Sequence, residues 1–419
     1  MADILDDLKA TADGHVREAG PDDAVAGVRP QWVVTPASTA ETAALLTAAA
    51  RHGLSVVARG SGSKLDWGAP PERVDVLVDT TRMDQVVEHA AGDLIVVVGA
   101  GRRLPDLQAD LAKAGQRLGI DPARAGTVGG AVATAATGPL RLFHGSVRDL
   151  VIGMRFVRAD GVVAHAGGKV VKNVAGYDLG KLLTGSFGTL GIITELAFRL
   201  HPVPAAQRWL TGSVSEPRGI QQAVSALVHS QLVPSAVELD RSDAGGTLAV
   251  LVEGIPPGVE QRVAEATSLL TGLGVEVSDA DTPPGWWGAE PASDGDVLLK
   301  VTHEIARTAR LLEALDDAAT STGLAASFRG SPAVGTAHVG VTSHHAEAVS
   351  AEAARELVDR LRRSAPLFGG SVVVLEAPAE VRTSMDVWGP VSALDLMRSV
   401  KQQFDPERRL APGRFVGGI

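Results

Sequence analysis

The chain has 419 residues, more than a single hydrophobic core usually organises, so we expect two domains. Hydrophobic residues make up 45% of the sequence and charged residues 21%, a balance typical of a globular protein with a large core. The formal net charge of −10 argues against a nucleic-acid partner, because such binding depends on Lys and Arg side chains that neutralise phosphates. The absence of cysteine excludes disulfides, thiolate nucleophiles and cysteine-ligated iron–sulfur clusters.

The N-terminal segment, residues 1–15, lacks the basic and apolar regions of a secretion signal. No apolar run in the sequence approaches the length of a membrane-spanning helix. We therefore expect a cytoplasmic protein without a direct membrane span, which reaches the inner face of a membrane only through partners.

The first half of the chain alternates short apolar runs with helical stretches. The pattern predicts a strand at 32–36, a helix at 39–52 and a strand at 54–58. Gly53 is typical of a residue just past a helix end. The second strand runs directly into a glycine loop at 59–64.

A second unit continues this alternation. The sequence predicts strands at 74–83 and 94–101, a helix at 104–114, a tract of small residues at 126–138 and a β-hairpin at 151–168. The hairpin is expected to turn at Asp160 and Gly161, and the glycine-rich half closes near Pro202.

The composition changes after Pro204, where strands and helices alternate without long glycine tracts. Their order and lengths predict an antiparallel sheet with helices on one face, roughly ferredoxin-like, in which no sequence repeat is apparent. The Pro- and Gly-rich stretch at 281–295 is predicted to be a surface loop. A last helix at 391–404 leads into a tail at 405–415.

The loop at 59–64 places Gly60 and Gly62 at the end of a strand. Such a loop can turn successive N–H groups toward one side, and the missing Cβ atoms let a phosphate approach closely. Ser61, Ser63 and Lys64 add hydroxyl or cationic donors. On these residues alone an ordinary turn is an equal alternative, and the spacing does not fit a Walker A loop.

Gly99 and Gly101 follow a strand and precede a helix, which is also how a dinucleotide-binding turn begins. Leu104 stands where the third glycine of that fingerprint is required, and no acidic residue ends a following strand at the expected distance. We therefore interpret this segment as a tight strand-to-helix turn and not as an NAD site.

The tract at 126–138 is the most informative stretch, because nearly all its side chains are Ala, Gly, Thr or Val. Backbone amides and small hydroxyls would then be the main surface offered to a ligand, which suits a large, flat, anionic cofactor. Close packing of a helix and a turn is the alternative.

Five segments together resemble one known family. They are ARGSGSK at 58–64, GTVGGAVATAATG at 126–138, HGSVRDLVIGMRFVRADGVV at 144–163, GGKVVKNVAGYDLGKLLTGSFGTLGIITELAFRL at 167–200 and FDPERRLAPGRF at 404–415. The chain resembles the FAD-binding oxidoreductases of the vanillyl-alcohol oxidase superfamily, whose FAD domain is of the PCMH type. The segment at 172–191 more narrowly resembles the FAD-binding (E) subunit of bacterial glycolate oxidase.

This resemblance implies an α+β protein with a flavin held between two α/β subdomains and a separate cap. We predict an N-terminal helical extension at 1–29, the FAD-binding domain at 30–204, a ferredoxin-like α+β cap at 205–385, and a C-terminal helix and tail at 386–419 that pack back on the FAD domain.

The resemblance also implies the residues that bind FAD. The predicted pyrophosphate site comprises Arg59, Gly60, Ser61, Gly62, Ser63, Lys64, Thr127, Val128, Gly129, Gly130, Ala133, Thr134, Thr137 and Gly138. Pro122 is expected near the flavin ring, and Gly145, Ser146, Ile192 and Ile193 near the ribose and adenine. Relatives with covalent flavin commonly use a His in the first loop, where this chain has Ser63 and Lys64, so a non-covalent FAD is expected.

Hydroxy-acid dehydrogenases of this superfamily often carry a His-x-Gly-Asp-Gly-Asn-x-His segment in the cap. The corresponding AHVGVTSHH at 337–345 lacks its Asp and Asn. The departure favours an accessory subunit that passes electrons to partners over a chain that oxidises a 2-hydroxy acid itself. The implied partners are a second flavin subunit and an iron–sulfur subunit. A self-sufficient dehydrogenase and a non-catalytic scaffold are the alternatives.

Several further side chains could serve the self-sufficient alternative, although no catalytic residue is assigned. They are Lys172, Tyr177, His303 and His338. A structural role is favoured for the cluster Lys172, Asn173, Tyr177 and Asp178, with Asp178 capping a helix. His338, His344 and His345 lack carboxylates at metal-ligand spacing, so no metal is expected. Trp286 and Trp287 could screen a flavin or mark an interface. Arg414 could reach back toward the flavin domain or equally be a surface residue.

Overall fold

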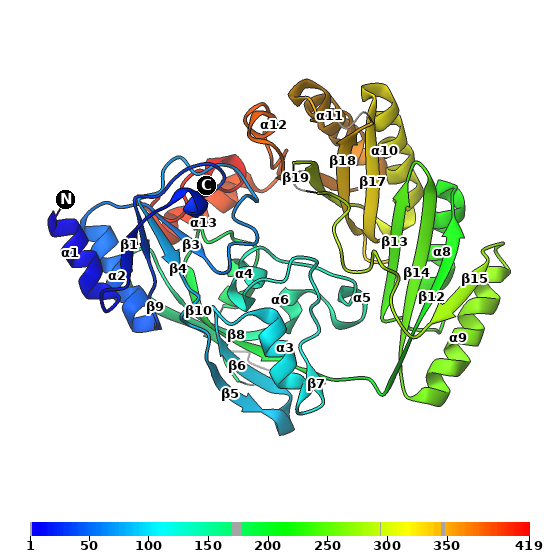
Figure 1. The fold of residues 1–419 in the computed structure, drawn as a ribbon, viewed down its shortest axis with the longest axis horizontal. Helices are drawn as coiled ribbons and strands as arrows, with labels where there is room; N and C mark the ends of the chain where they lie inside the picture. The colour runs from blue at the N-terminus through cyan, green and yellow to red at the C-terminus, as the bar shows by residue number, and fades with distance from the viewer. Residues whose placement is uncertain (1, 170–176, 294, 345–347) are drawn as a thin grey trace. The chain divides into compact units, whose positions relative to one another are not determined.

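The computed structural model describes residues 2–169, 177–293, 295–344 and 348–419. Lys172, Asn173 and His345, which the sequence singles out, lie outside the described residues. The chain divides into two compact units (Figure 1). The first comprises residues 1–137, 145–203 and 390–419, and the second comprises residues 138–144 and 204–389.

The first unit contains a four-stranded sheet of order β1-β2-β4-β3, in which β2, β4 and β3 are parallel and β1 is antiparallel. Its elements are α1 (Ala2–Thr11), β1 (Val16–Glu18), β2 (Trp32–Val34), α2 (Thr39–Arg51), β3 (Val56–Arg59) and β4 (Val76–Asp79). Helix α2 begins after Ser38, whose hydroxyl accepts a hydrogen bond from the N–H of Glu41. The strand, helix and strand predicted at 32–58 are therefore β2, α2 and β3.

The second sheet of this unit has five strands in the order β5-β6-β10-β8-β9, and all its pairs are antiparallel. Its elements are β5 (Val86–Ala90), β6 (Ile95–Gly99), α3 (Leu104–Ala112), α4 (Val128–Ala133), α6 (Val147–Leu150), β8 (Val151–Val157), β9 (Val163–Gly167), α7 (Leu179–Leu183) and β10 (Ile192–Arg199). A small pair, β7 (Gln116–Arg117) and β11 (His201–Pro202), and helix α13 (Leu394–Phe404) complete the unit.

This sheet differs in detail from the expected α/β pattern. Strands β6 and β8 are each antiparallel to β10, so they run parallel to one another with α3 and α4 in the connection between them. In chain order, β6, the two helices and β8 therefore resemble a βαβ unit. In the sheet, however, β10 lies between β6 and β8, so these two strands do not pair with one another. The predicted hairpin is β8 and β9, which turn at Gly161 with φ of +84°.

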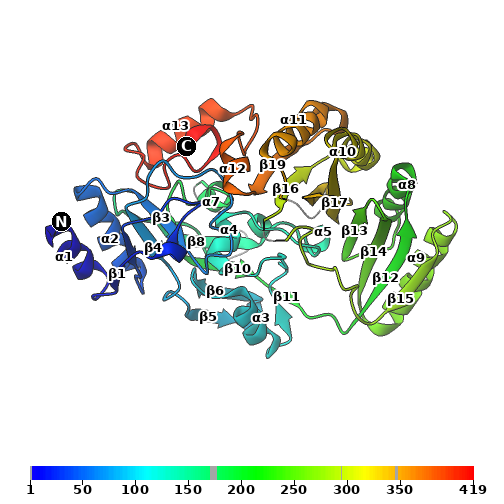
Figure 2. The same cartoon turned by 45° about the horizontal axis from the view of Figure 1, so that its top comes forward.

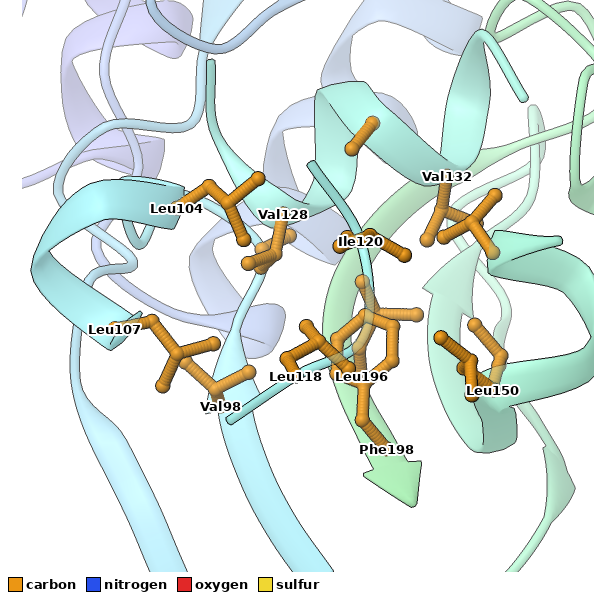
Figure 3. Close-up of a cluster of buried hydrophobic side chains, with 14 of the residues drawn as sticks. Val98, Leu104, Leu107, Leu118, Ile120, Val128, Val132, Leu150, Leu196 and Phe198 are labelled. Carbon is orange, nitrogen blue, oxygen red and sulfur yellow. The ribbon is translucent and has the colours of Figure 1, made fainter. Parts of the chain in front are cut away.

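The core of the first unit fixes the short helix α4 (Figure 3). Val128 and Val132, four residues apart, are fully buried against Ile120, Leu196 and neighbouring side chains. Because these valines occupy one face of the helix, the opposite face presents only small residues. That face forms part of the site described below.

The second unit is built on an eight-stranded antiparallel sheet of order β15-β12-β14-β13-β17-β18-β16-β19. Its elements are α5 (Arg141–His144), β12 (Ala206–Val214), α8 (Pro217–Val228), β13 (Ala236–Ser242), β14 (Gly245–Gly254), α9 (Pro256–Thr271), β15 (Val277–Ala280), β16 (Val297–Thr302), α10 (Thr308–Thr322), β17 (Leu324–Ser331), β18 (Thr336–Ser343), α11 (Ala351–Phe368), β19 (Ser371–Glu376) and α12 (Ala379–Thr383). Elements β12 to β15 form one βαββαβ unit and β16 to β19 form another, joined edge to edge through β13 and β17.

The predicted ferredoxin-like topology is therefore present twice. Helices α8, α9, α10 and α11 cover one face of the sheet, and α5 lies on the opposite face (Figures 1 and 2). The predicted α+β class is confirmed. In the parts of the chain that the structure describes, no helix is long and apolar enough to span a membrane.

Candidate cofactor site

The glycine loop begins where β3 ends, beside the parallel strand β4. Arg59 is the last residue of β3, and its guanidinium donates to Asp23 at 2.7 Å and to Asp79 at 2.6 Å. Arg17 pairs with the same Asp23. The hydrogen bond from Arg17, aided by the N–H of Gly20 and by Arg59, holds the pKa of the Asp23 carboxyl far below its usual range. The charge of Arg59 is thus compensated within the protein, and its side chain braces the start of the loop.

Two glycines shape the loop for different reasons. A Cβ atom at Gly60 would lie 2.1 Å from the hydroxyl oxygen of Thr127, so only glycine allows the loop to approach the start of α4 this closely. Gly62 has a φ of +81°, a left-handed conformation that other residues rarely adopt. A Cβ atom at Gly126 would lie 2.8 Å from the hydroxyl oxygen of Ser63. The loop and the small-residue tract are therefore in close contact.

The N–H groups of this loop are the feature that most favours a ligand. Within the described part of the chain, the amides of Gly60, Ser61, Gly62 and Ser63 donate to no protein acceptor. The hydroxyls of Ser61 and Ser63 likewise have no hydrogen-bond partner among the described residues. Buried amides are nearly always paired, and Gly60, Gly62 and Ser63 are partly buried beside a pocket, so their free donors indicate a place for an acceptor such as phosphate.

Helix α4 contributes a second wall. Thr127 caps it by accepting a hydrogen bond from the N–H of Gly130 at 3.1 Å. The amides of Val128 and Gly129 donate to the carbonyls of Arg102 and Ala100, both at 2.9 Å. These amides are therefore used within the protein, and α4 meets the pocket through its small side chains.

A third wall comes from two distant segments, 187–188 and the C-terminal tail. Phe187 has a φ of +54°, and its N–H donates to the carbonyl of Ala133 at the end of α4. Arg414 is 4% exposed, and its guanidinium donates to the carbonyls of Leu65 and Trp67 at 2.7 and 3.0 Å. The tail is therefore anchored on the glycine loop.

These walls enclose a pocket of about 90 Å³ in the first unit. Its lining residues are Ala58, Arg59, Gly60, Ser61, Gly62, Ser63, Lys64, Leu65, Gly126, Thr127, Gly130, Ala133, Thr134, Phe187, Gly188 and Arg414. Pockets that bury most of a drug-sized ligand enclose roughly 300–1,000 Å³, so this one fits a fragment of a dinucleotide, such as its pyrophosphate.

The structure brings ten of the sequence-predicted site residues into this pocket. They are Arg59, Gly60, Ser61, Gly62, Ser63, Lys64, Thr127, Gly130, Ala133 and Thr134. The remaining predicted residues do not line it, namely Pro122, Val128, Gly129, Thr137, Gly138, Gly145, Ser146, Ile192 and Ile193. Ile192 and Ile193 are buried in β10, and Ser146 donates its N–H and hydroxyl to Asp149 at the start of α6.

Sequence reasoning missed Phe187 and Gly188 as pocket residues, although both belong to the TGSFGTLG segment that carried the family resemblance. It also missed Ala58 and Leu65, which are immediate neighbours of predicted residues, whereas Gly126 begins the tract at 126–138 that the sequence favours for a ligand. Chain proximity to a glycine turn was the available signal.

Gly99 and Gly101 serve packing and line no part of this pocket. A Cβ atom at Gly99 would lie 2.2 Å from the carbonyl oxygen of Met83, and one at Gly101 would lie 1.9 Å from that of Thr80. Both glycines let the turn after β6 pass against the segment 80–83, as expected for a tight strand-to-helix turn.

A polar row crosses the eight-stranded sheet of the second unit, the predicted cap, on the face opposite its helices. Cross-strand register places Lys300, His338, Arg329 and Asp240 side by side on four adjacent strands. The neighbouring row ends at Arg241, which pairs with a residue of α10 and therefore faces the helices. The polar row thus lies on the other face, the open face.

The segment 281–295, predicted as a surface loop, packs on this open face. Trp287 contacts Trp209 with ring centroids 6.3 Å apart, and the guanidinium of Arg329 lies 5.9 Å from the ring centroid of Trp286. The Arg329 side chain also donates to the carbonyl of Glu290 at 3.0 Å. Only part of this segment is exposed to solvent, because tertiary contacts of its tryptophans override the loop composition.

Lys300 is the one partly buried cation of this row without a partner among the described residues. Burial, reinforced by the charge of Arg141, lowers the pKa of Lys300 to about 8. Sequence reasoning did not select this lysine, because its place in an apolar strand gives no sign of the neighbouring charges.

The other candidate side chains are dispersed. Tyr177 is 92% exposed. His303 is buried, its Nδ1 pairs with the carbonyl of Glu304, and burial lowers its pKa. His338 lies in the polar row of the second unit, opposite Lys300. No set of three metal-ligating side chains occurs within 2–169, 177–293, 295–344 and 348–419.

Comparison with known proteins identifies the class of protein and its cofactor. Residues 30–167 match the family described as an FAD binding domain. An uncharacterized FAD-linked oxidoreductase of Mycobacterium tuberculosis is 29% identical, over 93% of this chain and 91% of that protein. Glycolate oxidase subunit GlcD of Bacillus subtilis is 26% identical, over 92% and 89%. A D-lactate dehydrogenase of Archaeoglobus fulgidus is 29% identical, over 92% and 91%.

A narrower match has higher identity. Glycolate oxidase subunit GlcE of Escherichia coli is 37% identical, over 43% of this chain and 50% of that protein. Among solved structures, p-cresol methylhydroxylase has a TM-score of 0.73 at 17% identity, over 99% of this chain and 96% of that chain. Alkyldihydroxyacetonephosphate synthase has a TM-score of 0.73 at 18% identity, over 98% and 84%.

The glycine-lined pocket, the matched domain and the relatives together define an FAD-dependent oxidoreductase. Within that class, the matched domain, the relatives and the fold that it shares with the two solved structures over nearly its full length support the resemblance to the vanillyl-alcohol oxidase superfamily. The predicted family and the predicted cofactor are thereby confirmed.

Proposed function

We propose that this chain is the FAD-binding redox subunit of a glycolate oxidase-like 2-hydroxy-acid dehydrogenase complex. The observation that carries the proposal is the AHVGVTSHH segment at 337–345, where relatives with independent activity often carry Asp and Asn between paired histidines. The 37% identity to glycolate oxidase subunit GlcE supports it. The partners are a second flavin subunit, which oxidises the hydroxy acid, and an iron–sulfur subunit, which supplies the cysteines that this chain lacks.

The pocket residues hold the cofactor without a covalent bond in this proposal. The free amides and hydroxyls of residues 60–63 bind the pyrophosphate, with Thr134 and Arg414 on the opposite walls. Ser63 and Lys64 occupy the stretch in which a His would form a covalent link. Bound FAD supplies an acceptor for a hydride or an electron pair, which the protein environment tunes.

A self-sufficient 2-hydroxy-acid dehydrogenase is the second candidate. The polar row of the cap favours it, because Lys300 is a cation without a partner in the described chain and could bind a substrate carboxylate. Its neighbour His338 could accept a proton from a substrate hydroxyl. The identity to a D-lactate dehydrogenase over most of both chains supports this candidate.

Steady-state turnover separates the two candidates. The purified FAD-loaded chain is assayed with glycolate or D-lactate and an artificial acceptor, first alone and then with the second flavin subunit and the iron–sulfur subunit. We expect turnover only with the partners. Robust turnover by the chain alone would show the self-sufficient dehydrogenase.

The site assignment has a separate test. Gly62→Asp combined with Gly130→Asp places two carboxylates at the pocket, where they repel the pyrophosphate, so the protein should purify without FAD. Gly14→Asp combined with Gly219→Asp is the matched control, because Gly14 also has a positive φ and both positions are open. A yellow double variant with a full complement of FAD would exclude this pocket as the pyrophosphate site.

A further inference from the structure

The C-terminal tail, residues 405–415, is bound to the glycine loop by several independent contacts. The tail runs parallel to β3, with the N–H of Val56 donating to the carbonyl of Arg409 and the N–H of Ala411 donating to the carbonyl of Val56. Strand β3 is the element that ends in the glycine loop. The tail therefore extends the sheet edge from which that loop emerges.

A buried ion pair fixes the beginning of this tail. Lys401 is 4% exposed and donates to Asp405 at 2.7 Å, to the carbonyl of Leu410 at 2.9 Å and to that of Thr189 at 2.8 Å. Asp405 is fully buried and accepts from the N–H groups of Arg409 and Leu410. One ammonium thus ties α13 and the tail to the segment that follows the pocket residues 187–188.

The end of the tail reaches two walls of the pocket. Arg414 donates to the carbonyls of Leu65 and Trp67, which lie immediately after the free amides of the glycine loop. The ring of Phe415 packs against Phe187 with centroids 5.7 Å apart. The carbonyl of Lys64 is a third acceptor for the same guanidinium, at 3.4 Å, so one side chain holds the stretch 64–67 that directly follows the free amides of 60–63.

We propose that Arg414 is a positioning residue for the cofactor, which sets the shape of the glycine loop so that its amides face the pyrophosphate. This inference rests on the proposed assignment of the pocket to FAD. Thermodynamic linkage makes this effect reciprocal. The free energy by which the docked tail strengthens FAD binding equals the free energy by which bound FAD stabilises the docked tail.

Two variants of Arg414 test the hydrogen bonds against simple packing. Arg414→Met fills much of the same space without hydrogen-bond donors. Arg414→Lys keeps a charged donor group but replaces the planar guanidinium by a smaller ammonium. We expect FAD to bind about tenfold to a hundredfold more weakly to the Met variant, the range for lost charged hydrogen bonds, with part of that affinity recovered in the Lys variant. Arg408→Met is the matched control, since Arg408 lies in the same tail, is 48% exposed at its side chain and pairs with Glu72.

Titration of each apoprotein with FAD, followed by quenching of flavin fluorescence, gives the dissociation constants. Equal affinities for the Arg414→Met and Arg408→Met proteins, or equal affinities for the Lys and Met variants of Arg414, would overturn the proposal. If the Gly62 and Gly130 double variant loses FAD while Arg414→Met retains it, only this inference fails and the pocket assignment stands.

A second measurement uses the unmodified chain, so it does not depend on how a variant folds. Arg408 is exposed, and trypsin cleavage after it releases residues 409–419. Saturating FAD should slow release of this peptide, quantified by mass spectrometry, relative to release of peptides from the second unit. A release rate that does not change with FAD would contradict coupling between the tail and the cofactor.

Discussion

At the scale of single residues, Gly60 shows how a missing side chain builds the site. Its Cβ position is occupied by Thr127, so Gly60→Ala must push the glycine loop away from α4. Overpacking of this kind costs about 1–3 kcal/mol, and here the cost falls on the loop that offers the amides. We expect weaker FAD binding by flavin fluorescence titration. Gly92→Ala, at a glycine with open space around it, should bind FAD normally. Equal affinities for both proteins would mean that the loop tolerates the displacement.

At the same scale, the partly buried Lys300 should make the stability of the protein depend on pH. Its pKa in the folded chain is about 8, below the ordinary value of 10.5, because burial disfavours the ammonium. Between these values the unfolded chain holds more protons, so the free energy of unfolding rises with pH. Lys300→Met should therefore be more stable than the natural chain near about pH 7, and the difference should shrink toward about pH 10. Urea denaturation of both proteins across this range measures it. A difference independent of pH would show that the charge of Lys300 is not the cause.

At the scale of elements, helix α4 depends on a single cap. Thr127→Val keeps the shape of the side chain but removes the oxygen that accepts from Gly130. Loss of such a cap costs about 1 kcal/mol. Thr127→Ser keeps the acceptor, so it should remain closer to the natural chain. Denaturant unfolding of the first unit, monitored in the apoprotein, gives both values. Two variants of equal stability would place the contribution of Thr127 in its packing against Gly60.

The elements that sequence predicts well are those with local signals. The strand, helix and strand of β2, α2 and β3, and the hairpin of β8 and β9, appear where hydrophobic periodicity and turn residues place them. The glycine loop follows for the same reason, since Gly60 and Gly62 come directly after a strand. The helix predicted at 104–114 ends two residues earlier, at Ala112.

The elements that sequence predicts poorly depend on partners far along the chain. Strand β10 lies between β6 and β8 and pairs with both, and no local pattern in residues 192–199 predicts this position. The charged neighbours of Lys300 come from other strands through their register. Arg414 reaches the glycine loop from about 350 residues away, so its role required the folded chain.

At the scale of the whole molecule, the two units have different architectures. The first unit combines a largely parallel sheet of four strands with an antiparallel sheet of five. The second repeats one βαββαβ topology, and the repeats diverge in sequence because each position needs only a suitable side chain for its face. The repeat is consequently visible in strand order and not in the residues. In both repeats apolar residues face the helices, while the opposite face carries the polar row as well as the apolar cluster of Trp209, Ala236 and Leu251.

This division predicts two separable thermal transitions, because each unit has its own core. The pocket proposed for FAD lies within the first unit, so FAD at a hundredfold excess over its dissociation constant should stabilise that unit by about 2.7 kcal/mol. Phe328→Ala should lower only the other transition, since Phe328 is fully buried between β17 and the helices of the second unit. Removal of a buried Phe side chain costs about 3–5 kcal/mol.

Differential scanning calorimetry of the natural chain and the Phe328→Ala variant, each with and without FAD, distinguishes the four states. FAD should move one peak and the substitution the other, with additive effects because the two sites share no residues. A single peak that both changes shift together would mean that the two units unfold as one cooperative body. In that case bound FAD would stabilise the second unit against unfolding as well as the first.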